Sequence, residues 1–298
     1  MIKILLLLSG GLDSRLALKI LQKQAKLECI YFILPFSSGC CNPFCSLKFS
    51  LKEKTKLKIV DCRKGKLLQE YLDIIRKPKH GHGTGLNPCI DCRIFMLKKA
   101  KQYADKKNIE IIATGEVLNE RPMSQYKRAL EIVEQESGLQ GRLLRPLSAK
   151  LLPETNAEKL GKINRNLLFD ICGRSRKQQI ALAKKYNIDF PNPAGGCLLC
   201  EPGFCAKLRP LLKQKIKEID IELLKIGRHF ENSNILLGKN KEENDILEKI
   251  HKKYKNSILL VPEQPGPTAF VKSREYINQA KELMQKYSKH KIKEIKSC

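Results

Sequence analysis

Short apolar runs alternate with amphipathic segments over the first half of the chain. The runs that predict buried strands are residues 2–8, 29–34, 57–60 and 110–114. The segments whose apolar residues recur at helical spacing are 13–22, 47–56, 67–75 and 91–107. Strands that alternate with helices predict an α/β fold with a doubly wound parallel sheet. Such a sheet binds ligands at the carboxyl ends of its strands.

The pattern changes twice further along the chain. We expect a helix at 124–136 and a short strand at 143–144, and then a stretch richer in proline and glycine, residues 151–206, whose clearest helix is 178–186. From residue 207 on, helices alternate with short apolar strands, which predicts a small α+β module with a frayed Lys-rich end. The expected domains are therefore 1–150, 151–206 and 207–298.

Length and composition agree with a folded protein that lies in no membrane. The chain has 298 residues, of which 42% are hydrophobic, enough for two or three packed domains. No apolar run approaches the roughly 18 residues of a membrane span. The apolar start ends in a glycine turn after Leu8, so we interpret it as a first strand rather than a secretory leader. A reducing, cytoplasmic location follows as the expectation.

The charge indicates a polyanionic partner. Lys and Arg number 57 against 31 Asp and Glu, a formal net charge of +26. A biased composition is the simpler explanation, but a surplus of this size also attracts phosphates. Only 6% of residues are aromatic, so we expect a folded, phosphate-rich surface as partner rather than a single strand stacked on rings.

The strongest motif is the segment from Ser9 to Ser14, SGGLDS, which follows the first strand and opens the first helix. Gly10 and Gly11 allow the backbone to approach an anion, and a helix N-terminus supplies free N–H groups and a favourable dipole. Asp13 would repel phosphate, but it fits if it holds Mg²⁺ or caps the helix. The Lys of a Walker loop is missing.

Two further motifs carry cysteines. Cys89 and Cys92 form a Cys-x-x-Cys pair at a predicted helix start, where the dipole is expected to lower the thiol pKa values. Half of a structural zinc site is the alternative. Cys197 follows two glycines in a loop, which would leave its thiol with little steric cover. We expect this loop and the Cys-x-x-Cys pair to meet above one sheet.

Other candidate residues are less specific. Cys40, Cys41 and Cys45 follow the second predicted strand and could ligate zinc or an iron–sulfur cluster, or relay sulfur. His80 and His82 lie in a glycine-rich loop and either contact RNA, move protons or are solvated. Arg176, at the start of a predicted helix, either holds a phosphate or belongs to a solvated basic surface.

At these residues the chain resembles the PP-loop ATP pyrophosphatase superfamily, and within it the tRNA thiolation enzymes similar to tRNA 2-thiouridylase. The resemblance implies an adenine nucleotide alpha hydrolase-like fold, with ATP and Mg²⁺ bound over residues 9–14 and at Thr114-Gly115. It implies that Cys92 and Cys197 are catalytic and that Cys89 and Asp13 assist. The implied partners are tRNA and a sulfur donor such as a cysteine desulfurase or carrier. Glu116 departs from the pattern, because the closest members have His there.

The last module resembles the small RNA-associated domain of the NFACT family. The residues that carry this resemblance are the segment from Gly238 to Asn244 and the Pro265-Gly266-Pro267 turn. The resemblance implies that this module contacts RNA.

The implied reaction adenylates a tRNA uridine and replaces its carbonyl oxygen, at C2 or C4, with sulfur. Sulfur could arrive as a persulfide on Cys197 that is released by Cys92 or Cys89. It could also arrive on a [4Fe–4S] cluster held by these three cysteines, and their spacing suits both routes. Two other functions stay open: a PP-loop enzyme that acts on a small molecule, and a non-catalytic zinc-containing RNA-binding protein.

Overall fold

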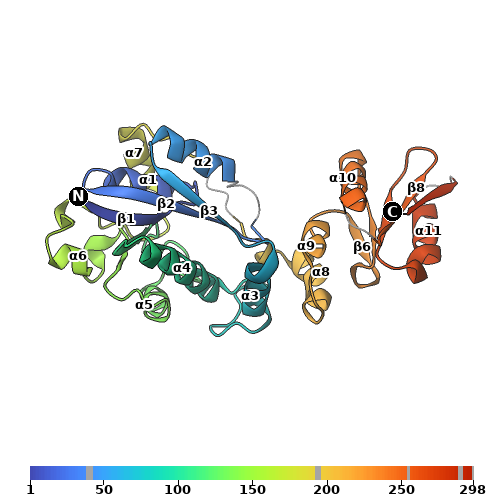
Figure 1. Ribbon diagram of the computed structural model, residues 1–298, viewed down its shortest axis with the longest axis horizontal. Helices are drawn as coiled ribbons and strands as arrows, with labels where there is room; N and C mark the ends of the chain where they lie inside the picture. Colours follow the sequence, from blue (N-terminus) through green and yellow to red (C-terminus); the bar gives the residue numbers. More distant parts are fainter. Residues whose placement is uncertain (38–42, 192–195, 254–255, 288–290, 297–298) are drawn as a thin grey trace. The chain divides into compact units, whose positions relative to one another are not determined.

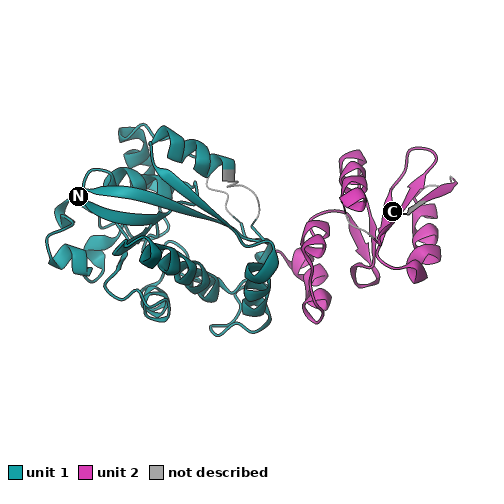
Figure 2. Cartoon of the chain, viewed as in Figure 1, with its two compact units in different colours: residues 1–200 teal, residues 201–298 magenta. Residues whose placement is uncertain are grey.

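The computed structural model describes residues 1–37, 43–191, 196–253, 256–287 and 291–296. The chain forms two compact units, residues 1–200 and residues 201–298 (Figure 2). The boundary expected at 206 falls inside one helix, α8 (Pro202–Leu212).

Unit 1 is built on a parallel sheet of five strands (Figure 1). The strands are β1 (Ile2–Leu7), β2 (Ala25–Ile33), β3 (Lys56–Asp61), β4 (Ile111–Thr114) and β5 (Leu143–Leu144). Their order is β3-β2-β1-β4-β5, and every pair is parallel. The predicted doubly wound sheet is confirmed. The strand order reverses beside β1, so the carboxyl ends of β1 and β4 flank the crevice in which such sheets bind ligands.

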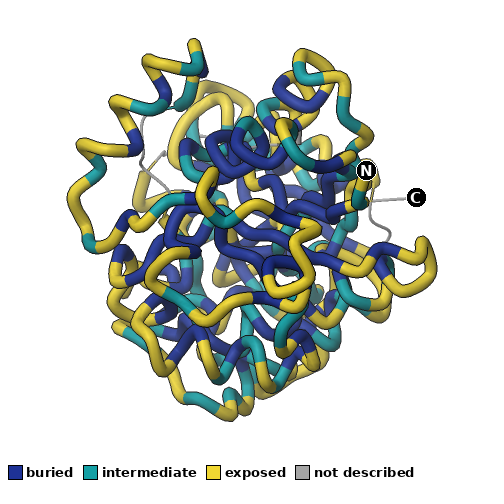
Figure 3. Tube along the Cα trace, turned by 90° about the vertical axis from the view of Figure 1, so that its left-hand side faces the viewer, coloured by how far each residue is buried: buried dark blue, intermediate teal, exposed yellow. Residues whose placement is uncertain are grey.

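Alternation along β1 explains the helices on both faces of the sheet. Ile4 and Leu6 pack in one apolar cluster with α1 (Leu12–Leu21), whereas Leu5 and Leu7 pack in another with α4 (Cys89–Lys106). A strand that is buried on both faces reads as a continuous apolar run, as β1 does. Figure 3 shows these buried segments enclosed by exposed chain.

The remaining elements of unit 1 complete the two helical layers. They are α2 (Pro43–Lys52), α3 (Gly65–Arg76), α5 (Lys127–Glu136), η1 (Ala149–Leu151), α6 (Asn156–Lys159), η2 (Arg165–Leu167), α7 (Lys177–Lys185) and η3 (Leu198–Cys200). Helix α7 packs against α1. Residues 151–200 therefore belong to unit 1 and do not form a domain of their own.

Unit 2 holds an antiparallel sheet of order β10-β8-β9-β7-β6. Its elements after α8 are α9 (Glu218–Leu223), β6 (Arg228–Phe230), η4 (Glu231–Ser233), β7 (Ile235–Leu237), α10 (Lys241–Lys253), β8 (Ile258–Pro262), β9 (Ala269–Val271), η5 (Arg274–Tyr276), α11 (Ile277–Gln285) and β10 (Ile292–Lys296). Apolar clusters lie on both faces of the sheet. The expected fraying is wrong for residues 292–296, because they pair with β8 along its whole length.

Among the described helices, none combines the length and the apolar character that a bilayer-spanning helix requires.

Candidate nucleotide and thiol site

The glycine turn after β1 opens α1 without a side-chain cap. Gly10 has φ +82°, a left-handed conformation that favours glycine, and a Cβ there would lie 2.8 Å from Ser46 Oγ. Ser14 Oγ donates to the Gly11 carbonyl at 2.9 Å, and no described side chain caps the helix start. The first N–H groups of α1 therefore remain available to an anion.

The turn after β4 closes against the same helix start. A Cβ on Gly115 would lie 2.6 Å from both the Asp13 carbonyl carbon and the Ser14 nitrogen. Only glycine permits this backbone approach. Thr114 is 1% exposed, and its hydroxyl donates to Glu116 Oε2 at 3.0 Å. The ends of β1 and β4 thus form one continuous wall.

Asp13 carries an unsatisfied carboxylate oxygen at this wall. Its Oδ1 is buried and has no hydrogen-bond partner among the described residues. Burial raises the pKa of Asp13 to about 6, and the negative charge of Glu120 adds to this, whereas Arg176 and Arg121 oppose it. An orphaned oxygen that is costly to ionise fits a divalent cation, so the chemistry of Asp13 suits the expected Mg²⁺ ligand.

Glu120 was not predicted from the sequence, because a single acidic residue in a turn carries no pattern. It is 7% exposed, and Arg176 holds it with two hydrogen bonds to Oε1, of 3.0 and 2.8 Å. Arg176, a candidate phosphate ligand, is therefore engaged within the protein.

Glu116 links the β4 turn to the cysteine helix. Its side chain is 2% exposed and lies between Arg93 Nε, at 3.0 Å, and Arg145 Nε, at 3.2 Å. The Arg93 contact is an ion pair rather than an aligned hydrogen bond, since Glu116 Oε1 has no such partner among the described residues. Burial opposes ionisation, but the two guanidinium groups outweigh it, so the pKa of Glu116 lies below its ordinary value. Arg93 directly follows Cys92, so these ion pairs connect the turn after β4 to the Cys-x-x-Cys motif.

Backbone hydrogen bonds bring the Cys197 loop to the Cys-x-x-Cys motif. Leu198 N donates to Phe36 O at 3.0 Å, and Leu86 N donates to Leu199 O at 2.8 Å. Residues 197–199 thus lie between the loop after β2 and the segment that leads into α4. The expected meeting of distant cysteines occurs in this way.

Tyr71 of α3 contacts the Cys-x-x-Cys motif. Its hydroxyl lies 3.4 Å from Cys92 Sγ, and Asn87 Nδ2 donates to Cys89 Sγ at 3.2 Å. Burial raises the pKa of Tyr71 well above its ordinary value, and the neighbouring sulfurs of Cys92, Cys197 and Cys89 raise it further. All three sulfurs therefore lie within electrostatic reach of one phenol.

The expected low thiol pKa is wrong for Cys92. Burial raises the pKa of Cys92, and the effect exceeds the lowering by Tyr71 and Arg93. Burial also raises the pKa of Cys197, to about 12, so its thiol is less open than a glycine loop suggested. Both thiols are therefore uncharged at neutral pH, and for Cys92 desolvation outweighs the dipole of α4.

The predicted cysteine sites for zinc or an iron–sulfur cluster have no counterpart among the described side chains. In the parts of the chain that the structure describes, no group of three or more His, Cys, Asp and Glu side chains is arranged to hold a metal ion. Cys40 and Cys41 lie outside the described residues. Cys45 is half-buried in the first turn of α2, beside Gly10.

The histidine loop supports the helix start. The backbone nitrogens of Lys79 and His80 donate to the Asp91 carboxylate at 3.1 and 3.0 Å. The His80 ring pairs with Glu136 at 3.0 Å, and His82 Nε2 lies 2.9 Å from Ile75 O. Both rings are therefore engaged within the protein, and the loop fixes the first turn of α4.

A parallel sheet with an uncapped glycine loop after β1 and a second glycine turn after β4 defines the PP-loop class of α/β proteins. The family model for thiamine biosynthesis protein (ThiI) matches residues 2–151. The chain belongs to the ThiI family.

Solved structures and curated proteins add little to this family assignment. Among solved structures, the chain is similar to a predicted subunit of tRNA methyltransferase from Methanocaldococcus jannaschii, with 13% identity and a TM-score of 0.33. That similarity covers 66% of this chain and 96% of the other. Among curated proteins no match is found.

Proposed function

We propose that the protein is an ATP-dependent tRNA sulfurtransferase. The observation that carries the proposal is the placement of Cys89, Cys92 and Cys197 around Tyr71, joined through Arg93 and Glu116 to the glycine turns. Membership of the ThiI family and a net charge of +26 support a thiolation reaction on an RNA. A cytoplasmic location follows from such a substrate.

The first step forms an adenylated base. The uridine carbonyl oxygen attacks the α-phosphate of ATP, the bond to the β-phosphate breaks, and pyrophosphate leaves. The N–H groups at the start of α1 and the hydroxyls of Ser9 and Ser14 stabilise the negative charge of the phosphates. Mg²⁺ bound at Asp13 would neutralise part of that charge. Adenylation converts the carbonyl oxygen into a good leaving group.

The second step transfers sulfur. The terminal sulfur of a persulfide on Cys197 attacks the activated carbon, and AMP departs with the electrons of the C–O bond. Cys92, or Cys89 in the same motif, then attacks Cys197 Sγ and frees the thiolated base, which leaves a disulfide. An external thiol reduces this disulfide, and a cysteine desulfurase or carrier replaces the persulfide. The raised pKa of Cys92 means that the attacking thiol must lose its proton within the complex.

The alternative route places sulfide on a [4Fe–4S] cluster held by the same three cysteines. The described side chains do not offer a three-ligand arrangement, and we derive no step through such a cluster.

Unit 2 would bind the phosphate backbone of the tRNA. Within this unit a hollow of about 260 Å³ is lined in part by Lys215, Lys217 and Lys272, and Lys272 pairs there with Asp220 at 2.6 Å. Lys215 and Lys217 suit a phosphate backbone, and the NFACT resemblance of this module points the same way.

The test is to incubate the purified protein with ATP, Mg²⁺, unmodified tRNA and a persulfide donor. We expect release of AMP and pyrophosphate that depends on tRNA, together with a thiouridine in digested nucleosides analysed by mass spectrometry. The position of the sulfur in that nucleoside distinguishes C2 from C4. AMP release without tRNA would favour a small-molecule substrate. No nucleotide turnover, with RNA binding and bound zinc, would favour the non-catalytic protein.

A further inference from the structure

Helix α2 presents an apolar stripe to solvent. Phe44, Leu47 and Leu51 are 74%, 36% and 67% exposed and lie three or four residues apart, so they share one side of the helix. Ile59 of the adjacent strand β3 is 38% exposed. Contiguous exposed apolar side chains of this kind mark interaction sites.

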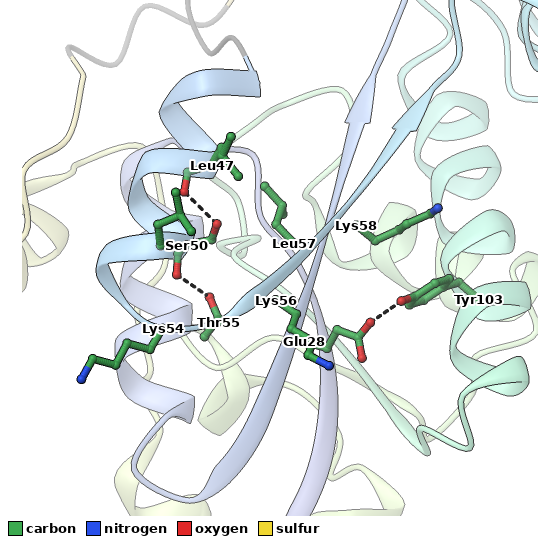
Figure 4. Close-up of a pocket in the computed structure, with 10 residues that line it drawn as sticks. Glu28, Leu47, Ser50, Lys54, Thr55, Lys56, Leu57, Lys58 and Tyr103 are labelled. Atoms are coloured by element: carbon green, nitrogen blue, oxygen red, sulfur yellow. Dashed lines mark hydrogen bonds between the residues drawn. The ribbon is translucent and has the colours of Figure 1, made fainter.

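The stripe lies beside an open edge of the sheet. Strand β3 is the last strand in the order and pairs only with β2 among the described strands. Leu57 and Ile59 alternate with Lys56 and Lys58, so they share the opposite face of this strand from the lysines. Figure 4 shows Leu57 directed toward Leu47, at a hollow of about 530 Å³.

Hydrogen bonds hold two sides of the hollow in place. The hollow is distinct from the nucleotide and thiol site. Thr55 Oγ1 donates to Ser50 O at 3.2 Å, which ties the end of α2 to the start of β3. On the other side, the Tyr103 hydroxyl donates to Glu28, and burial and this hydrogen bond raise the pKa of Tyr103 to about 12. The lining residues lie near the amino end of β3, whereas the glycine turns lie at the carboxyl ends of the strands.

Lysines surround the apolar centre. On the side of α2 these are Lys48, Lys52 and Lys54, which are all exposed, whereas Lys56 and Lys58 lie on the opposite face of β3, where Glu28 and Tyr103 also line the hollow. The one acidic residue between 43 and 60, Glu53, pairs with Lys19 at 2.5 Å and has a side chain that is 6% exposed. The exposed rim on the side of α2 is therefore positive.

The exposed apolar side chains and the positive charge around them favour one kind of partner. A second copy of the chain would bring two lysine rims together, which is unfavourable. A phosphate backbone would pair with the lysines but would leave Leu47, Leu51 and Ile59 in water. We propose that the α2–β3 face, defined by Phe44, Leu47, Leu51, Ile59 and the lysines Lys48, Lys52 and Lys54, docks a protein partner with an apolar centre and an acidic rim. Addition of a partner strand to the open β3 edge fits the same surface.

The α2–β3 face is linked to the glycine loop by a single helix. Ser46 and Cys45, in the first turns of α2, lie against Gly10. A partner on the exposed side of α2 therefore sits one helix diameter from the glycine loop. This inference does not rest on the proposed sulfur chemistry, since it would hold for any partner that serves the site.

The test is to place a photo-crosslinking residue at position 51 in the full chain, in cells of the source organism. The matched control is the same residue at Leu160, which is 68% exposed in unit 1. We expect position 51, and not 160, to capture a protein with an acidic surface, identified by mass spectrometry and then purified. Capture only of RNA, only of a second copy, or equally at both positions would overturn the proposal.

The purified partner allows the chemistry to be checked. We expect Leu51→Asp and the pair Lys52→Glu with Lys54→Glu each to weaken binding about tenfold or more, and the second variant to bind with a smaller salt dependence. Leu160→Asp and Lys159→Glu should leave binding unchanged. Leu51→Asn provides a milder variant if Leu51→Asp disturbs folding, and thermal unfolding of each variant checks this. Unaltered affinity in both α2–β3 variants would refute the proposal even if tRNA thiolation is demonstrated.

Discussion

Gly115 lies in backbone contact with Ser14, because a Cβ on Gly115 would come within 2.6 Å of the Ser14 nitrogen. The turn after β4 thus packs directly against the glycine turn and helix start that follow β1. Neither turn alone would form a closed wall, and the contact fixes the helix start at which Asp13 is buried.

Substitution of this glycine should damage nucleotide binding. Gly115→Ala pushes the β4 turn away from α1, and we expect ATP affinity to fall about tenfold or more, since a small misplacement of binding groups is costly. Isothermal titration calorimetry measures this. Gly203→Ala is the control, because a Cβ there meets nothing within 4 Å. Equal ATP affinity in the two variants would contradict the role of the contact.

Asp13→Asn should abolish AMP formation and yet stabilise the folded protein. The folded pKa of Asp13 is raised to about 6, so its ionised form destabilises the ligand-free protein at pH 7. We expect the variant to lose AMP formation and to gain about 1 kcal/mol of unfolding free energy at pH 7, after allowance for solvent screening. The gain should shrink as pH falls from 6 and vanish below about pH 3.8, where the wild-type carboxyl is protonated in both states. Urea unfolding that shows a less stable variant at pH 7 would rule out this account.

Glu116→Gln should weaken the fold strongly. The change leaves Arg145, whose side chain is 3% exposed, without one of its two carboxylate partners, and breaking a buried pair costs about 3 kcal/mol. The folded pKa of Glu116 is lowered, so its stabilising contribution is present above the unfolded pKa near 4.3 and lost as pH falls below it. Denaturant unfolding at pH 7 and pH 4 measures both effects. Glu131→Gln, at an exposed residue, serves as control. A similar loss of unfolding free energy in both variants would contradict the explanation.

Cys197→Ala should uncouple the two chemical steps. We expect tRNA binding and pyrophosphate release to persist while thiolated nucleoside disappears, because the residue acts after adenylation. Cys172→Ala, at an exposed cysteine of the same unit, should keep full activity. Undiminished thiolation in Cys197→Ala would remove this cysteine from the mechanism.

Unit 2 should loosen at mildly acidic pH through His229. Its Nε2 lies 2.9 Å from Ile226 O and its Nδ1 lies 2.9 Å from Ser233 Oγ, which suits a neutral ring. Burial, and then the charge of Lys207, lower the pKa of His229 to about 4. The stabilising contribution is therefore present above pH 6.5 and lost between 6.5 and 4, on the order of 2 kcal/mol. Hydrogen exchange of peptides from 201–298 measures the loss, and His229→Gln should show a flatter pH dependence over that range.

Much of the fold could be predicted because its signals are local. The apolar run of β1, the glycines after it and the helical spacing of α1 each occupy a few adjacent residues. The strand that was missed at 292–296 has a Lys-rich sequence, and its pairing with β8, some thirty residues away in the chain, gives it its conformation.

The sequence by itself determined the fold class and the glycine loop, because hydrophobic period and turn chemistry act between neighbours. It also singled out Cys89, Cys92 and Cys197 as candidates. Only the tertiary structure decided the protonation of Cys92. Burial raises its thiol pKa where the helix dipole alone would lower it, and this burial outweighs the opposite effect of the Tyr71 hydroxyl. The same holds for Glu116, whose role comes from two arginines distant in the chain.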